Sequence, residues 1–221
     1  MLPPQDPLAG QSALAVASVD GQGRDARILL ALPLARSLLQ ELASEQGESR
    51  TLLSWDDQAQ RVRSERQVQL GALVLERQAV AAADPEAVRE VLLAQIEAQG
   101  LAVLPWSDGS RQLQQRLALA HSHRGSPWPA RDDGALVATL RDWLGPQLLG
   151  VRSFEDLRQL DLNEALWHGL DWAQRQELEQ LLPSDLAIAS GRQARLDYSE
   201  GRPVLAVKLQ ELFGTRQHPT V

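Results

Sequence analysis

The segment from Ala194 to Gly214 constrains the fold more than any other part of the sequence. Leu196 and Tyr198 alternate with polar residues, which is the pattern of a strand with one buried face. A turn is expected at residues 199–202, and residues 204–207, with the sequence VLAV, are apolar on both faces. A strand that is apolar on both faces must be covered by other elements. We therefore expect two antiparallel strands that the preceding helices cover, with a left-handed glycine ending the segment.

Helix-start signals recur through the second half of the chain. An Asp or Ser that can accept a hydrogen bond from the backbone precedes each apolar helical stripe. The stripe around Leu136 and Trp143 predicts one helix that ends before Pro146, and residues 185–189 are expected to form a strand. We therefore expect a mainly helical domain over residues 84–221, closed by a small antiparallel sheet. Its helices are predicted to begin after Asp84, Ser107, Asp132, Ser153, Asp161 and Asp171.

The first 80 residues have the pattern of strands with a single short helix. Glycines at residues 21–24 are suited to the turn between the first two strands. Five strands with a helix between the second and third fit a small β-barrel of the OB type, although the strand count alone does not decide this. The expected fold class is α+β, with an OB-like β-barrel domain over residues 1–80. Strands are predicted at residues 13–20, 26–32, 50–57, 60–68 and 70–76, and the helix at residues 34–44.

Charge and composition narrow the classes of function. The 221 residues carry a formal net charge of -7, whereas a free-standing nucleic-acid domain is usually basic. Strong autonomous RNA binding is therefore disfavoured, and local basic patches stay open. Cysteine is absent, no apolar run is long enough to span a bilayer, and the N-terminus lacks the features of a signal peptide. We expect a cytoplasmic protein without contact to a membrane.

The best candidate for nucleic-acid binding lies on one predicted hairpin. Arg61 and Arg63 project from the same strand face, with Arg66 beyond them and Trp55 across the hairpin. Arginines bind phosphates, and an aromatic ring can stack on a base, as OB-folds do with single strands. The competing interpretation is a solvated strand face, on which Glu65 cancels part of the charge. Trp55, Arg61, Arg63 and Arg66 are the candidate nucleic-acid-binding residues.

Other polar pairs fit structural roles better than chemical ones. Asp56 and Asp57 are adjacent on a strand and point to opposite faces, so a turn is the expected role. His121 and His123 could bind zinc, but no further ligand at a fixed spacing accompanies them. We expect no metal site and no catalytic residue in this chain.

Five of the six tryptophans lie in the helical half of the sequence. Trp143 falls on the apolar stripe of its helix and is expected in the core. Trp128 stands between Pro127 and Pro129 in a loop, which favours exposure. We therefore expect Trp128 on an interaction surface.

Three stretches of the sequence resemble one protein family. The C-terminal segment ARLDYSEGRPVLAVKLQELFG is accompanied by residues 53–75, which begin with LSWDD and end with QLGALVL, and by residues 100–107, which end with LPWS. Together they resemble the distal C-terminal region of bacterial ATP-dependent RNA helicases of the HrpB type, in the DEAH/RHA group. The resemblance extends over nearly the whole chain and implies an OB-like domain before the helical one. It also implies that the chain is truncated at both ends relative to the family.

The family's catalytic motifs are not among these residues. No G-x-x-x-x-G-K-[ST] loop is present to hold phosphates, so we expect that this chain alone does not hydrolyse ATP. The resemblance places ATP and Mg²⁺ in other domains of the parent protein, and implies its RecA-like helicase domains and RNA as partners.

The leading hypothesis is an accessory helicase region that supports RNA binding or docks to the helicase core. A protein-interaction module without direct nucleic-acid contact is the alternative. An independent hydrolase has no support, since a G-x-S-x-G nucleophile motif, for example, does not occur.

Overall fold

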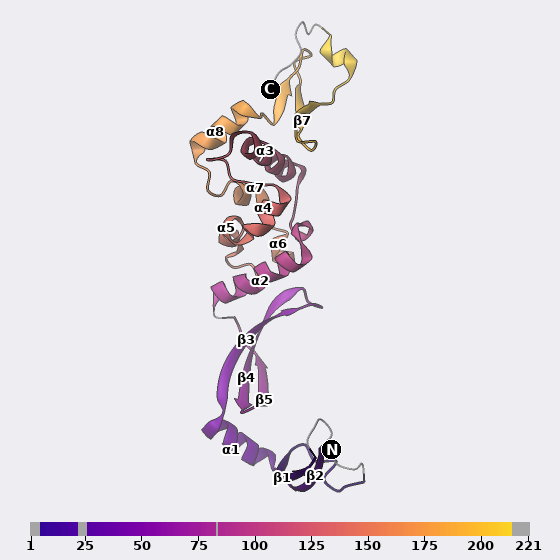
Figure 1. Ribbon diagram of the computed structural model, residues 1–221, viewed down its shortest axis with the longest axis vertical. Helices are drawn as coiled ribbons and strands as arrows, with labels where there is room; N and C mark the ends of the chain where they lie inside the picture. The colour runs from indigo at the N-terminus through magenta and orange to yellow at the C-terminus, as the bar shows by residue number, and fades with distance from the viewer. Residues whose placement is uncertain (1–4, 22–25, 83, 214–221) are drawn as a thin grey trace. The chain divides into compact units, whose positions relative to one another are not determined.

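The computed structural model describes residues 5–21, 26–82 and 84–213 (Figure 1). The chain divides into two compact units, the first with residues 1–52 and 64–81, the second with residues 53–63 and 82–221. The sequence predicts a domain boundary between residues 80 and 84, and this boundary stays a prediction.

The first unit holds strands and one helix close to where the sequence predicts them. Strands β1 and β2 pair antiparallel, from Leu14 opposite Pro33 to Asp20 opposite Arg27. The glycine-containing turn predicted between them lies largely outside the described residues. A second sheet has the order β3-β4-β5, and β3 and β4 continue into the second unit. The elements are β1 (Leu14–Asp20), β2 (Arg27–Pro33), α1 (Arg36–Gln46), β3 (Glu48–Asp56), β4 (Arg61–Leu70) and β5 (Leu73–Ala79).

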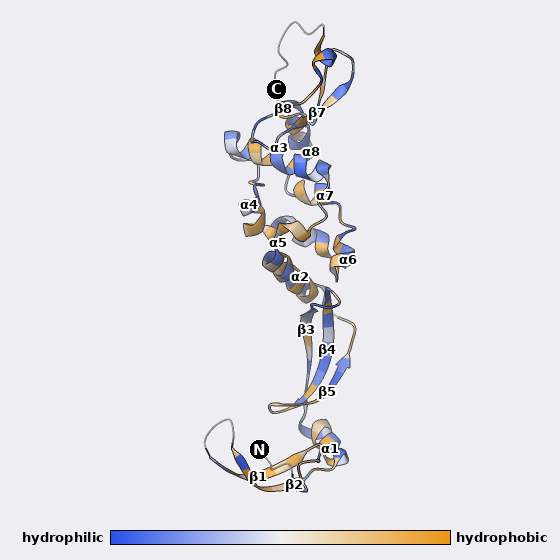
Figure 2. Ribbon diagram, turned by 90° about the vertical axis from the view of Figure 1, so that its right-hand side faces the viewer, coloured by the Kyte–Doolittle hydropathy of each residue, from blue (hydrophilic) through white to orange (hydrophobic). Residues whose placement is uncertain are grey.

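The predicted OB-like barrel is wrong for the residues that the structure describes. A barrel requires its strands to close into one hydrogen-bonded sheet, whereas here they form a two-stranded and a three-stranded sheet. Ser64 and Gln67 are the buried residues of the described part of this unit, and no apolar side chain in that part is buried. Figure 2 shows hydrophobic residues along β1 and β2. The alternation of the sequence predicted the strands correctly but did not specify which strands pair.

The second unit is mainly helical, as predicted. Each of the six predicted cap residues accepts a hydrogen bond from a backbone N–H of the following helix. The expected helix through Trp143 is broken at Thr139, whose hydroxyl donates to the carbonyl of Ala135 at 2.8 Å. Such a bond to the preceding turn competes with regular helix geometry. The helices are α2 (Pro85–Gln99), α3 (Asp108–Arg124), α4 (Asp133–Ala138), α5 (Leu140–Trp143), α6 (Phe154–Leu157), α7 (Leu162–Leu166) and α8 (Trp172–Leu181).

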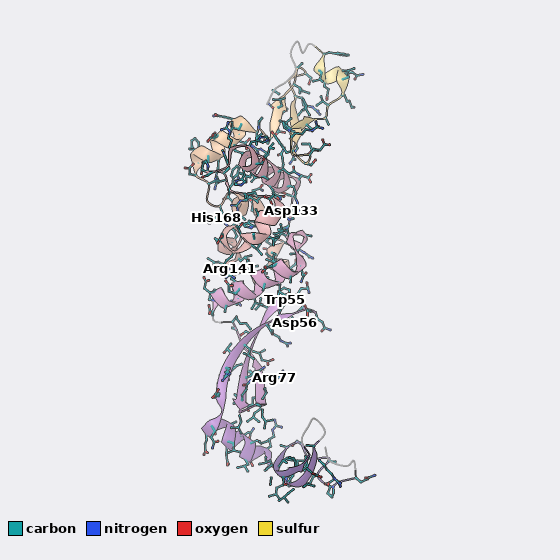
Figure 3. All side chains as sticks on the ribbon, in the orientation of Figure 1. Trp55, Asp56, Arg77, Asp133, Arg141 and His168 are labelled. Atoms are coloured by element: carbon teal, nitrogen blue, oxygen red, sulfur yellow. The ribbon has the colours of Figure 1, made fainter. Side chains whose placement is uncertain are left out.

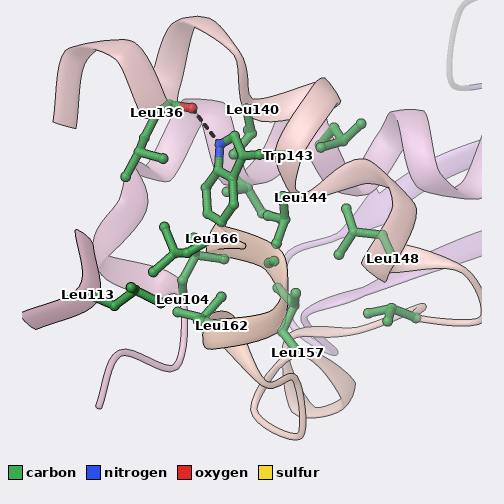
Figure 4. Packing of buried hydrophobic residues seen from close by; sticks show 14 of the residues in the cluster. Leu104, Leu113, Leu136, Leu140, Trp143, Leu144, Leu148, Leu157, Leu162 and Leu166 are labelled. Carbon is green, nitrogen blue, oxygen red and sulfur yellow. Dashed lines mark hydrogen bonds between the residues drawn. The ribbon is translucent and has the colours of Figure 1, made fainter. Parts of the chain in front are cut away.

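The core of the second unit consists mainly of leucine side chains (Figure 4), and two buried tryptophans, Trp128 and Trp143, belong to it. Trp143 is fully buried, and its indole N–H donates to the carbonyl of Leu136 at 2.9 Å. This bond satisfies the polar atom of a side chain that otherwise contributes apolar area. The prediction that Trp143 is a core residue is confirmed.

A three-stranded antiparallel sheet follows the helices, in the order β6 (Asp185–Ala187), β7 (Gln193–Asp197) and β8 (Val204–Leu205). Leu196 and Tyr198 are buried, as their alternation predicted. The Gln112 side chain on α3 donates to the carbonyls of Ser184 and Leu196, which holds the sheet to the helix. Tyr198 donates to the carbonyl of Pro183 at 2.6 Å, and burial raises the pKa of its hydroxyl to about 12.

The strand expected over residues 204–207 is shorter and less buried than its composition indicated. It pairs over two residues, which are half-buried, and Ala206 is exposed. The chain then turns into a short 3-10 helix, Leu209–Leu212, whose first residue is exposed. The prediction of burial on both faces is therefore wrong, because no second layer covers this strand in the described part of the chain. The glycine stop expected at Gly214 lies outside that part.

Leu166→Ala tests the core of the second unit. Leu166 is fully buried, so its truncation should cost about 2–5 kcal/mol of unfolding free energy. Urea unfolding followed by far-UV circular dichroism measures this loss. The matched control is Leu149→Ala, because Leu149 is 62% exposed and its change should stay within about 0.5 kcal/mol. Equal losses for both variants would contradict this description of the core.

Candidate nucleic-acid interface

Residues 53–63 form the tip of the hairpin between β3 and β4 and belong to the second unit. Two backbone hydrogen bonds hold this tip. The N–H of Val62 donates to the carbonyl of Arg152 at 2.8 Å, and the N–H of Phe154 donates to the carbonyl of Gln60 at 3.0 Å. The candidate residues on the tip are thus fixed to a segment about ninety residues later in the chain.

Trp55 packs on the helical part of the second unit. Its ring lies 4.8 Å from the ring of Phe154, centroid to centroid, at an angle of 49°. The side chain is partly buried against the core, and its indole nitrogen has no hydrogen-bond partner among the described residues. Figure 3 labels Trp55 and Asp56 at the tip of the hairpin. This packing gives Trp55 a structural role, and stacking on a base stays a prediction. Phe154 was missed by the sequence analysis, because nothing local links it to the hairpin.

Arg61 and Arg63 are exposed on either side of the buried Val62. Nη1 of Arg63 lies 3.6 Å from Oδ2 of Asp56, which is the distance of an ion pair. Arg61 lies opposite Ser153 in an antiparallel bridge, and its guanidinium makes no hydrogen bond or ion pair with any described residue. The predicted common face of the two arginines is therefore present, and Arg61 lies near Asp56 without forming an ion pair with a described residue.

Arg66 belongs to the other unit. It donates from Nη2 to the side-chain oxygen of Gln78 on β5, at 2.8 Å. Trp55, Arg61 and Arg63 therefore lie together in the second unit, whereas Arg66 lies in the first unit.

Asp56 begins the turn, as expected for this pair of acids. Its Oδ1 atom accepts hydrogen bonds from the N–H groups of Gln58 and Ala59, at 3.1 and 3.0 Å. The bond from Ala59 contributes most to a lowered pKa of the carboxyl group. Partial desolvation opposes this effect, while the bond from Gln58 and the nearby arginines add to it. The turn therefore keeps a negative charge beside Arg63.

Trp128 is buried in the core of the second unit, with 3% of its surface exposed. The expectation of an exposed interaction residue is wrong, because flanking prolines indicate a loop but not the direction of a side chain.

The carbonyl of Trp128 lies 2.6 Å from Nδ1 of His121. No group of three potential metal ligands from His, Cys, Asp and Glu occurs in the described residues. His121 thus has a structural contact in this loop.

Within the described ranges, none of the helices combines the length and the apolar composition that crossing a bilayer requires.

Comparison with known proteins gives consistent matches. Residues 46–80 match the family model described as the connector region of ATP-dependent RNA helicase HrpB, and residues 143–221 match the model described as the ATP-dependent helicase C-terminal region. The ATP-dependent RNA helicase HrpB of Escherichia coli K12 is 35% identical over 199 residues, which cover 89% of this chain and 25% of that protein.

Two solved structures are similar over nearly the whole chain. The E. coli DExH-box NTPase HrpB matches with a TM-score of 0.61 and 32% identity, over 98% of this chain and 27% of that one. The E. coli DEAH/RHA helicase HrpB matches with a TM-score of 0.60 and 30% identity, over 100% of this chain and 28% of that one.

These matches define the class first: the chain is similar to a C-terminal part of DEAH/RHA-type helicases. More narrowly, it carries the connector and C-terminal regions of the HrpB family, which confirms the resemblance seen in the sequence. It spans about a quarter of the length of the curated relative that it matches.

Arg63→Gln tests the electrostatics of the hairpin tip. In the unmodified chain the pKa of Asp56 should lie below its ordinary value of 3.8, as measured by NMR titration. The variant should raise this pKa only in part, because the backbone hydrogen bonds remain. A lowered pKa stabilises the folded state above about pH 4, and this contribution is lost as the pH falls through the folded-state pKa.

The control for this titration is Arg202→Gln, since Arg202 pairs with Glu200 in the turn after β7. It should leave the titration of Asp56 unchanged. Titration of Asp56 at or above 3.8 in the unmodified chain would contradict the described turn.

Proposed function

We propose that this chain is the C-terminal accessory region of an HrpB-type ATP-dependent RNA helicase in the bacterial cytoplasm. It docks to the helicase core through the first unit, which makes up most of the domain proposed over residues 1–80, while residues 84–221 form the family's C-terminal domain. ATP and Mg²⁺ are bound, and ATP is hydrolysed, by the RecA-like domains of the longer protein. The exposed apolar surface of β1 and β2 carries this proposal.

The two-stranded sheet of β1 and β2 exposes much apolar surface for its size. Branched apolar side chains on β1 and β2 are between 46% and 69% exposed: Val16, Val19, Leu29, Leu30 and Leu32. Because successive residues of a strand point to opposite faces, Leu30 and Leu32 share one face of β2 and Leu29 lies on the other. An isolated two-stranded sheet is only marginally stable in water, and exposed apolar side chains on a shared face favour association. Burial of these side chains against a partner would supply the core that the described first unit lacks.

The helicase core is the partner that fits best. The curated relative is about four times as long as the matched region, so most of such a protein consists of other domains. Two domains of one polypeptide can stay in contact even when their affinity is low, because the covalent link raises the effective concentration of each domain near the other. An apolar surface that is exposed in the separate chain is expected for such a contact.

Leu30→Ser combined with Leu32→Ser tests docking. The partner is E. coli HrpB from which the region matching this chain has been removed, and calorimetry measures the affinity. Loss of two apolar side chains from the contact should weaken binding by about tenfold or more.

The control for docking is Leu149→Ser combined with Leu209→Ser. These leucines are 62% and 74% exposed in the second unit, against 60% and 69% for Leu30 and Leu32. Equal weakening by both pairs of substitutions, or no binding by the unmodified chain, would count against docking through β1 and β2.

Contact with RNA is the second candidate function, and the exposed face of Arg61 and Arg63 favours it. Arginines on a strand face bind the phosphates of a single strand without reading its sequence. Among the described residues no carboxylate forms an ion pair with Arg61, and Arg63 has one at 3.6 Å. Trp55 and Arg66 were predicted to join this site, and their contacts within the protein support a smaller contribution.

Arg61→Glu combined with Arg63→Glu tests this contact in an HrpB-type helicase that carries this region. Binding of single-stranded RNA should weaken, and the slope of log K against log salt should fall by about 1.4 in magnitude when two phosphate contacts are lost. The control pair is Arg192→Glu with Arg202→Glu, since each of these arginines pairs with a carboxylate in the C-terminal part of the second unit. Unchanged affinity at low salt would favour the protein-interaction module without nucleic-acid contact.

A further inference from the structure

A groove in the second unit lies between α3 and the C-terminal sheet. Two open cavities of about 410 and 530 Å³ adjoin along it. Arg111 and Gln115 line both cavities, so the two form one continuous groove. One wall is the face of α3 from Asp108 to His123, and the other consists of β7 and the turn that follows it. Figure 1 shows α3 beside β7.

The polar groups along the groove are held in place by one another. The guanidinium of Arg111 lies over the ring of Trp106, 3.7 Å from the centroid, and donates to Gln114 Oε1 at 3.0 Å. Gln114, which is buried, donates in turn to Asp133 Oδ1 at 2.7 Å. Polar groups that are fixed before binding lose little freedom when a ligand arrives. The groove is therefore a preorganised polar surface.

Gln115 is the exception in this network. Its side chain is half-buried at the junction of the two cavities, and its amide makes no hydrogen bond with any described residue. A carboxamide offers two N–H donors and one acceptor oxygen. It therefore matches the N–H and carbonyl pair that an extended polypeptide backbone presents.

The charges along the groove select among polar ligands. Four aspartates and two arginines line it. Both arginines already have hydrogen-bond acceptors within the protein. Arg195 donates to the carbonyl of Asp108 at 2.8 Å, and Arg111 donates to Gln114. Asp133 Oδ1 lies 3.7 Å from Nη1 of Arg111, and the Asp133 side chain is still 74% exposed. The lining is therefore net negative, which attracts cationic side chains and repels a polyanion such as RNA.

We propose that this groove binds an extended polypeptide segment that carries arginine or lysine side chains. The lining face of α3 is about 22 Å long, from its rise per residue, and accommodates about six residues of extended chain. The backbone of the segment pairs with the amide of Gln115, and its cationic side chains lie near Asp132 and Asp133. This surface is separate from the hairpin tip and does not depend on the function proposed above.

The test uses the whole chain and blocked six-residue peptides. The probe is acetyl-Gln-Ala-Arg-Gln-Arg-Ala-amide, and the comparison peptide carries glutamate in place of both arginines. NMR shifts of the Gln115 side-chain amide and of the backbone at Ser122 and Ser199 report occupancy of the groove. The arginine peptide should bind at least about tenfold more tightly than the glutamate peptide, as expected from the net negative lining.

Variants separate the groove from adventitious binding. Gln115→Ala should weaken the arginine peptide about fivefold or more, the loss expected for one hydrogen-bonding group. The control, Gln176→Ala, removes an exposed glutamine from α8 and should leave affinity unchanged. No binding of the arginine peptide, equal affinity of the Gln115→Ala variant, or tighter binding of a six-nucleotide RNA at the same signals would each overturn the proposal.

Discussion

Burial of leucine side chains around Trp143 determines how the second unit is arranged. The short helices from Asp133 to Leu166 are too brief to be stable alone, and packing against α2 and α3 compensates for this. The same core receives Trp55, so the tip of the β3–β4 hairpin is held beside residues 152–154. It also fixes α3, which carries Gln112 to the sheet and Arg111 and Gln115 to the groove. Both proposed binding surfaces of this unit therefore depend on one core.

The described first unit has no comparable core. Its two sheets place apolar side chains in solvent, and the residues that are buried, Ser64 and Gln67, are polar. Hydrogen bonds within a two-stranded sheet contribute too little to stabilise it without burial of apolar area. This imbalance between the units is the physical basis for docking, and it explains why an accessory region can combine one self-sufficient part with one that needs a partner.

Local signals predicted most of the elements and few of the long-range contacts. Asp84, Ser107 and Asp171 cap their helices as expected, because capping depends on the residues of a single turn. The barrel was predicted wrongly, since strand pairing depends on residues far apart in sequence. Trp128 was placed wrongly for the same reason: the residues that bury it are distant in the chain. The face shared by Arg61 and Arg63 follows from strand periodicity, whereas the packing of Trp55 on Phe154 has no local signal.

Backbone amide hydrogen exchange in the purified chain tests the central claim most directly. If the first unit lacks a core of its own, amides of β1 and β2 should exchange at least about a hundredfold faster than those in the middle of α3, and adding the helicase portion of an HrpB protein should slow them. Protection of β1 and β2 equal to that of α3 in the isolated chain would contradict the account.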